Sequence, residues 1–195
     1  MEVIGLTGGI GMGKSTAAAA FRRARIPVFD ADAAVHALQA PGGRALRAIG
    51  AAFPGTVKDN TLDRAALRSA VLGRPDALAR LEGIIHPMVR ADERAFLARA
   101  RRRGARAAVL DIPLLLETGG QARVDRVVVV SAPRAVQVAR VRKRQRMDQA
   151  QIDAVIARQM PDARKRRLAD VVVRTGLSRH HALRTIRRLI RELQA

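Results

Sequence analysis

The 195-residue chain has no cysteine, no tryptophan and no tyrosine, and its only aromatic residues are four phenylalanines. Without cysteine it can form no disulfide framework, thiolate nucleophile or sulfur-ligated zinc site, which suits a reducing cytosol. No apolar run approaches the roughly 18 residues of a membrane span, and the first residues follow a strand pattern rather than that of a secretion signal. We therefore expect a soluble cytoplasmic protein with no membrane partner.

Acidic residues are also scarce. The chain has 37 lysines and arginines against 17 aspartates and glutamates, giving a net charge of +20. Such a surface attracts anions, whether nucleic acid, acidic membranes or phosphorylated small molecules. The shortage of aromatic rings argues against single-strand binding, in which bases stack on them. A hydrophobic fraction of 48% supports a packed core, and we expect no dedicated nucleic-acid partner.

Short apolar runs without polar alternation alternate along the chain with helix-length stretches. Runs of this kind are typical of strands covered on both faces, and they cover residues 3–7, 26–29, 107–110, 127–130 and 171–173. Helical spacing is found over residues 15–25, 133–146, 147–159 and 178–193. This order predicts an α/β fold with a doubly wound, mainly parallel sheet of about five strands and helices on both faces.

One region interrupts the alternation. Between about residues 41 and 103 the patterns are only helical, with Asp63 as a predicted N-cap and Pro87 as a predicted first helical residue. Four helices are predicted there, over residues 43–53, 63–72, 75–84 and 87–103. We expect a single domain over residues 1–195, in which an all-helical insertion (about 41–103) and a helical lid (about 140–167) interrupt a core of residues 1–40, 104–139 and 168–195.

Residues 8–15, Gly-Gly-Ile-Gly-Met-Gly-Lys-Ser, match the pattern G-x-x-x-x-G-K-[ST] between a predicted strand and a predicted helix. We call this segment the P loop. Its glycines allow backbone N–H groups to surround phosphate oxygens, Lys14 reaches the β- and γ-phosphates, and Ser15 offers a hydroxyl to Mg²⁺. The alternative is a glycine-rich turn with an incidental lysine. Such a turn would not require the glycines, the lysine and the hydroxyl residue to occupy all of these positions. The predicted nucleotide contacts are Gly9, Gly11, Met12, Gly13, Lys14, Ser15 and Thr16.

A P loop identifies a phosphate-bearing ligand but not a reaction, because motors, GTPases, transporters and small-molecule kinases share it. The chain is short for a motor or a transporter subunit, and it lacks the Asn-Lys-x-Asp pattern of guanine-specific GTPases. The favoured interpretation is a small-molecule kinase.

Carboxylates follow two of the predicted strands. Asp30 and Asp32 come directly after the second strand, at the sheet edge where open α/β folds bind ligands, so either can deprotonate an acceptor hydroxyl. The alternative is that Asp30 caps the next helix and Asp32 complements its dipole; we favour catalysis for Asp32 and capping for Asp30. Asp111 ends the third strand and is predicted to bind Mg²⁺ with Ser15, through water. Glu117 has either a structural role, which we favour, or a substrate contact.

Arg140 and Arg144 lie four residues apart on one predicted helix, so both can reach the same phosphates. The alternative is that both arginines lie on a solvated helix face, since the chain is rich in arginine. His86 lies in the helical insertion, and a lone histidine there more often packs or caps than catalyses.

Several segments together resemble the dephospho-coenzyme A kinase family: residues 5–16, 29–32, 86–87, 111–117, 137–144 and 159–161. The resemblance implies transfer of the ATP γ-phosphate to the ribose 3′-hydroxyl of dephospho-coenzyme A, with Mg²⁺ as cofactor. It implies that Asp32 is the base and that Lys14 and Arg140 act on the phosphates, with a lid closing around Arg144. The substrate contacts that it implies are Thr7, Asp32, His86, Pro113 and Leu114.

One departure from the family pattern affects base recognition. Where the family often has Asp-Asn before a glycine, this chain has Arg174-Thr175-Gly176, so adenine selection would rest on backbone contacts and the choice between ATP and GTP stays open. The alternative functions are a nucleoside or nucleoside-monophosphate kinase and a basic nucleic-acid-binding protein with a vestigial nucleotide site. We expect a monomer or weak homo-oligomer.

Overall fold

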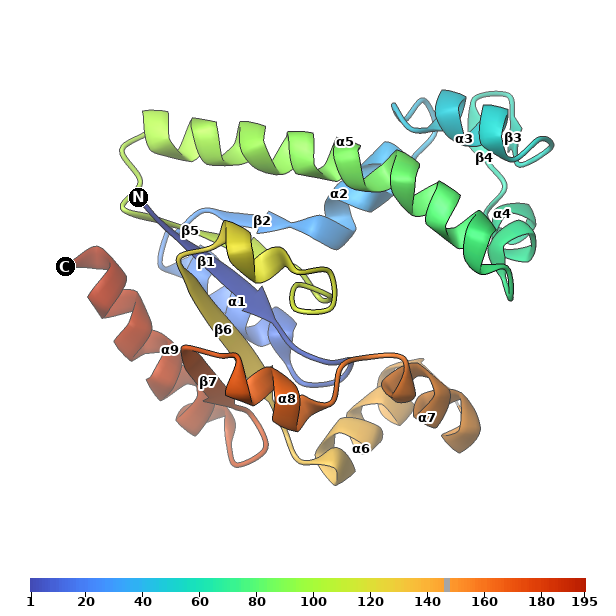
Figure 1. The fold of residues 1–195 in the computed structure, drawn as a ribbon. Helices are drawn as coiled ribbons and strands as arrows, with labels where there is room; N and C mark the ends of the chain where they lie inside the picture. The colour runs from blue at the N-terminus through green and yellow to red at the C-terminus, as the bar shows by residue number, and fades with distance from the viewer. Residues whose placement is uncertain (146–147) are drawn as a thin grey trace. The chain divides into compact units, whose positions relative to one another are not determined.

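The structure is a computed structural model that describes residues 1–145 and 148–195 (Figure 1). A five-stranded sheet has the order β2-β5-β1-β6-β7. Its strands are β1 (Glu2–Thr7), β2 (Val28–Asp30), β5 (Ala107–Asp111), β6 (Arg126–Ser131) and β7 (Val171–Arg174). All five predicted strands are therefore confirmed, and the α/β class with them.

The central strand β1 sets the position of the P loop. It runs parallel to β5, in a register that joins Leu6 to Asp111, and parallel to β6 on its other side. Five of its six residues are buried, as expected for a strand covered on both faces. The P loop leaves the carboxyl end of β1, so the register places Asp111 at the same edge of the sheet.

Helices cover both faces of this sheet. On one face α1 (Lys14–Arg23) packs against β1 and against α9 (Arg179–Gln194), and on the opposite face α8 (Asp162–Arg167) packs against β6 (Figure 1). Small residues on α1, including the fully buried Ala18, allow this close packing around Phe21. Two further helices, α6 (Arg134–Gln145) and α7 (Gln149–Ala157), lie between β6 and α8 in the sequence. Within the described residues, no helix is long and apolar enough to cross a membrane.

The chain divides into two compact units, residues 1–29 with 99–195, and residues 30–98. The second unit contains α2 (Ala31–Leu38), α3 (Leu46–Ala52), α4 (Arg64–Val71) and most of α5 (Pro75–Arg102). Its own core is built around Leu46, Ile49 and Phe53. This unit starts earlier than the predicted insertion, at residue 30, because Leu38 of α2 packs into that core.

The second unit differs from its predicted all-helical pattern in two ways. Strands β3 (Val57–Lys58) and β4 (Thr61–Leu62) form a small antiparallel pair, because Asp59 and Asn60 both adopt the positive φ of a tight hairpin turn. The predicted helix start at Pro87 is wrong, since α5 runs through this residue. Pro87 and Gly83, four residues earlier, are both exposed, so the carbonyl that loses its hydrogen bond is able to face solvent.

Candidate nucleotide-binding site

The P loop has the backbone shape that phosphate binding requires. Gly11 and Gly13 have φ values of 72° and 94°, in the left-handed region that favours glycine. Gly13 is the N-cap of α1, and no side chain caps this end of the helix. The partial positive charge at the start of α1 is therefore available to an anion.

Two residues predicted to act on phosphate and metal are brought together. The Lys14 Nζ lies 2.6 Å from Asp111 Oδ1, and these two side chains are 19% and 5% exposed. Ser15, the other predicted metal ligand, is exposed at the second position of α1. The first turn of α1 and the end of β5 thus place an ammonium group, a carboxylate and a hydroxyl at the carboxyl end of the central strands.

Arg140 on α6 also reaches the P loop. Its guanidinium group donates hydrogen bonds to the Thr175 side chain and backbone, at 2.9 and 2.7 Å, and to the Gly11 carbonyl oxygen at 3.4 Å. The Thr175 hydroxyl in turn donates to the Met12 carbonyl oxygen at 2.6 Å. Thr175 therefore joins the arginine to the P loop, a role that sequence analysis missed.

A pocket of about 240 Å³ flanks this threonine. The residues around it belong to the end of β6 and the loop after it, to α8, and to the end of β7 and the loop after it, and they include Pro133, Asp162, Arg166, Arg174 and Gly176. The segment in which the sequence predicted base recognition thus borders a cavity at the carboxyl end of β6 and β7.

Met12, a predicted nucleotide contact, is 3% exposed. Its sulfur accepts a hydrogen bond of 3.0 Å from the Ala132 backbone N–H. The side chain therefore fastens the P loop to the loop after β6, leaving only its backbone for a nucleotide.

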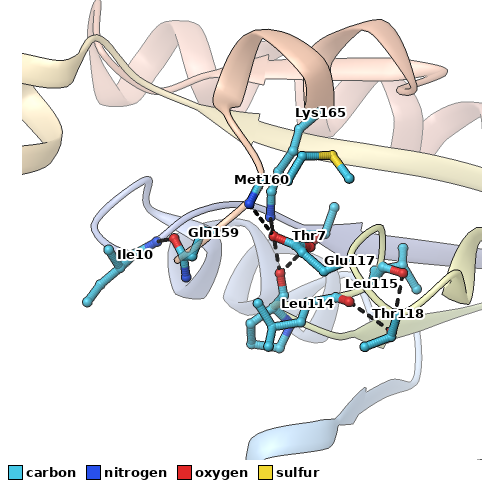
Figure 2. A network of polar contacts seen from close by, with 10 residues as sticks. Thr7, Ile10, Leu114, Leu115, Glu117, Thr118, Gln159, Met160 and Lys165 are labelled. Atoms are coloured by element: carbon cyan, nitrogen blue, oxygen red, sulfur yellow. Dashed lines mark hydrogen bonds and ion pairs between the residues drawn. The ribbon is translucent and has the colours of Figure 1, made fainter. Parts of the chain in front are cut away.

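Beyond β5, the loop that contains Pro113 and Glu117 forms a buried polar network (Figure 2). Thr7 is fully buried and donates its hydroxyl to the Pro113 carbonyl oxygen at 2.8 Å. Lys165 of α8, only 1% exposed, lies 2.7 Å from Glu117, which also accepts a 3.0 Å hydrogen bond from the Met160 N–H. These contacts support the structural role favoured for Glu117. The predicted substrate contacts of Thr7 and Pro113 stay predictions, as does that of Leu114, which is exposed.

This buried ion pair leads to a stability prediction. Replacing Glu117 with alanine would leave the Lys165 charge buried without its carboxylate, at a cost of about 3–5 kcal/mol. For a chain of this size, we expect the midpoint of thermal unfolding to fall by roughly 10 °C. In the double variant Glu117→Leu with Lys165→Met, which removes both charges, most of this loss should be recovered. A midpoint unchanged in Glu117→Ala would contradict the assignment.

The remaining candidates belong mainly to residues 30–98. Asp30 caps α2, accepting a 3.0 Å hydrogen bond from the Ala33 N–H, so its predicted capping role is confirmed. Asp32 is exposed in the first turn of the same helix. His86 is exposed within α5, away from either end of that helix. The side chain of Arg144 lies outside the described residues, and its role stays a prediction.

The fold and the site together define a P-loop phosphotransferase of the small-molecule kinase class. The family model described as dephospho-CoA kinase matches residues 2–179. A dephospho-CoA kinase from Gluconobacter oxydans is 54% identical over 100% of this chain and 98% of its own length. One from Paramagnetospirillum magneticum is 60% identical over 85% and 78%. A crystal structure of a Thermus thermophilus protein superposes with a TM-score of 0.85, at 34% identity over 100% and 98%. The chain belongs to the dephospho-CoA kinase family.

Proposed function

We propose that this protein transfers the γ-phosphate of ATP to the ribose 3′-hydroxyl of dephospho-coenzyme A, giving coenzyme A and ADP. The observation that carries the proposal is a P loop that leads into the uncapped N-terminus of α1, with Lys14, Asp111 and Arg140 beside it, in a chain of this family. The cysteine-free composition suits the cytoplasm as the place of reaction.

Lys14 and Arg140 are proposed to stabilise the charge on the phosphoryl group during transfer. Lys14 would leave its ion pair with Asp111 and bind the β- and γ-phosphates instead, because the carboxylate and the phosphates are all anionic partners within reach of a flexible lysine. The Arg140 guanidinium is already oriented by Thr175, so less side-chain entropy is lost when it binds phosphate. The backbone of residues 9 to 16 would hold the remaining oxygens.

The residues at the sheet edge also fit a magnesium ion. Ser15 and Asp111 supply a hydroxyl and a carboxylate, the hard oxygen donors that Mg²⁺ prefers. When bound with the nucleotide, the ion would neutralise charge on the β- and γ-phosphates. Asp111 would contact the ion through a water molecule, because Mg²⁺ usually keeps several of its own waters and binds few protein groups directly.

Asp32 is proposed to receive the proton of the acceptor hydroxyl, and His86 to contact the coenzyme. In this assignment the helical insertion of about residues 41–103 holds dephospho-coenzyme A. Within the lid of about residues 140–167, the part around Arg144 would close over the phosphates, excluding water and suppressing ATP hydrolysis. The pocket beside Thr175 would take the nucleotide base.

A coupled assay that follows ADP formation tests the function. Dephospho-coenzyme A should be phosphorylated, and the new phosphate should be located on the 3′-oxygen by phosphorus-31 NMR. Nucleosides and nucleoside monophosphates serve as competing acceptors in the same assay. Turnover of these acceptors without turnover of dephospho-coenzyme A would overturn the proposal. Comparing ATP with GTP as donor resolves the base preference.

A further inference from the structure

Two glutamines hold the peptide groups of a single P-loop residue, Ile10. Its N–H donates a 3.0 Å hydrogen bond to Gln159 Oε1, and its carbonyl oxygen accepts a 2.8 Å hydrogen bond from Gln137 Nε2. Gln137 lies on α6 and Gln159 follows α7, so the two side chains come from different elements. Both main-chain polar groups of Ile10 are thus bonded to side chains outside the P loop.

The glutamines also fill the space beside the loop. A Cβ atom on Gly9 would lie 3.1 Å from Gln159 Oε1 and 3.3 Å from Gln137 Nε2. On Gly11 it would lie 2.9 Å from the Gln137 carbonyl oxygen and 2.8 Å from Val141 Cγ2. The loop therefore rests directly against α6 and Gln159, with glycine at the points of closest approach.

Each glutamine is itself fixed. Gln137 is only 4% exposed. Gln159 precedes Met160, whose N–H is held by Glu117, and Glu117 is held by the buried Lys165 (Figure 2). Because these anchors restrict both side chains, the peptide groups on either side of Ile10 have little freedom to rotate.

We propose that Gln137 and Gln159 are positioning residues for nucleotide binding. By holding the two peptide groups that flank Ile10, they keep the P loop in its phosphate-binding shape before the nucleotide arrives. A glycine-rich loop without such support would lose conformational entropy on binding, and affinity would fall accordingly. The inference rests on the proposed function only in taking Mg-ATP as the nucleotide.

Neutral variants of similar length test the hydrogen bonds. In Gln137→Met and in Gln159→Met, the Kd of Mg-ATP measured by calorimetry should rise about tenfold, equivalent to about 1.4 kcal/mol. The Kd of dephospho-coenzyme A and the midpoint of thermal unfolding should change little. Gln149→Met is the matched control, since Gln149 is an exposed residue of α7 whose side chain contacts Arg142 and Asp153 instead of the P loop.

Glutamate variants test the direction of each hydrogen bond. Gln159→Glu keeps an oxygen that accepts from the Ile10 N–H, whereas Gln137→Glu faces the Ile10 carbonyl oxygen with another acceptor. Both add one negative charge beside Ile10, so repulsion of the triphosphate is common to them. The Kd of Mg-ATP should therefore rise at least tenfold more in Gln137→Glu than in Gln159→Glu.

The proposal is overturned if either methionine variant raises the Kd of Mg-ATP less than threefold, or weakens dephospho-coenzyme A binding equally. It is also overturned if the two glutamate variants do not differ as stated. These readouts are binding constants, so they test the positioning role of the two glutamines even if the wild-type protein phosphorylates a different acceptor.

Discussion

Replacing Lys14 with methionine should lower the turnover of dephospho-coenzyme A by at least about a thousandfold, the scale of cationic stabilisation in phosphoryl transfer. Methionine keeps much of the stem of lysine and removes only the ammonium group. That group lies beside the P loop and Asp111, where charge would develop on the transferred phosphoryl group. The Kd of Mg-ATP should rise as well, because Lys14 also contacts the phosphates of the bound ground state. Steady-state kinetics and calorimetry measure the two effects separately.

The ion pair between Lys14 and Asp111 complicates this experiment and suggests its control. Without the ammonium group, the largely buried Asp111 carboxylate loses a cationic partner at 2.6 Å, so thermal stability should also decline. Adding Asp111→Asn to Lys14→Met removes that charge and should restore stability without restoring turnover. Turnover of Lys14→Met within tenfold of wild type would rule out the proposed role.

The sheet and the P loop could be predicted because local sequence specifies both. Strands buried on two faces need continuous apolar residues, as the four valines of β6 illustrate. The helix boundary predicted at Pro87 failed for a tertiary reason. A proline is tolerated within a helix when the carbonyl group it leaves unbonded faces solvent, and local sequence does not reveal which side of α5 is exposed.

Much of the support around the site could not be predicted, because its partners are far apart in the sequence. Gln137, Gln159 and Thr175 reach the P loop only after the chain has folded. Composition gave at most a partial signal: among 37 basic residues only four are lysines, and two of these, Lys14 and Lys165, form ion pairs at 2.6 and 2.7 Å. The other two, Lys58 and Lys143, are exposed, so the scarcity of lysine did not by itself identify the enclosed charges.

The proposed roles of Asp30 and Asp32 can be separated by the same substitution at both positions. Asparagine caps a helix about as well as aspartate, so Asp30→Asn should keep α2 intact, together with near-normal turnover. Asp32→Asn removes a carboxylate that is exposed and does not cap the helix, so stability should again be retained. Any large difference in turnover between the two variants would then reflect chemistry rather than folding.

In Asp32→Asn we expect kcat to fall by about 10²–10⁴-fold, the usual contribution of a general base. The loss in kcat is expected because an amide cannot take up the proton of the acceptor hydroxyl. The Kd of Mg-ATP should stay within about twofold of wild type, because the amide adds no charge that would repel the triphosphate. Rapid-quench measurement of a single turnover would place the loss in the chemical step. A large loss in Asp30→Asn with near-normal Asp32→Asn would transfer the role to Asp30, and near-normal turnover in both would exclude a carboxylate base from this segment.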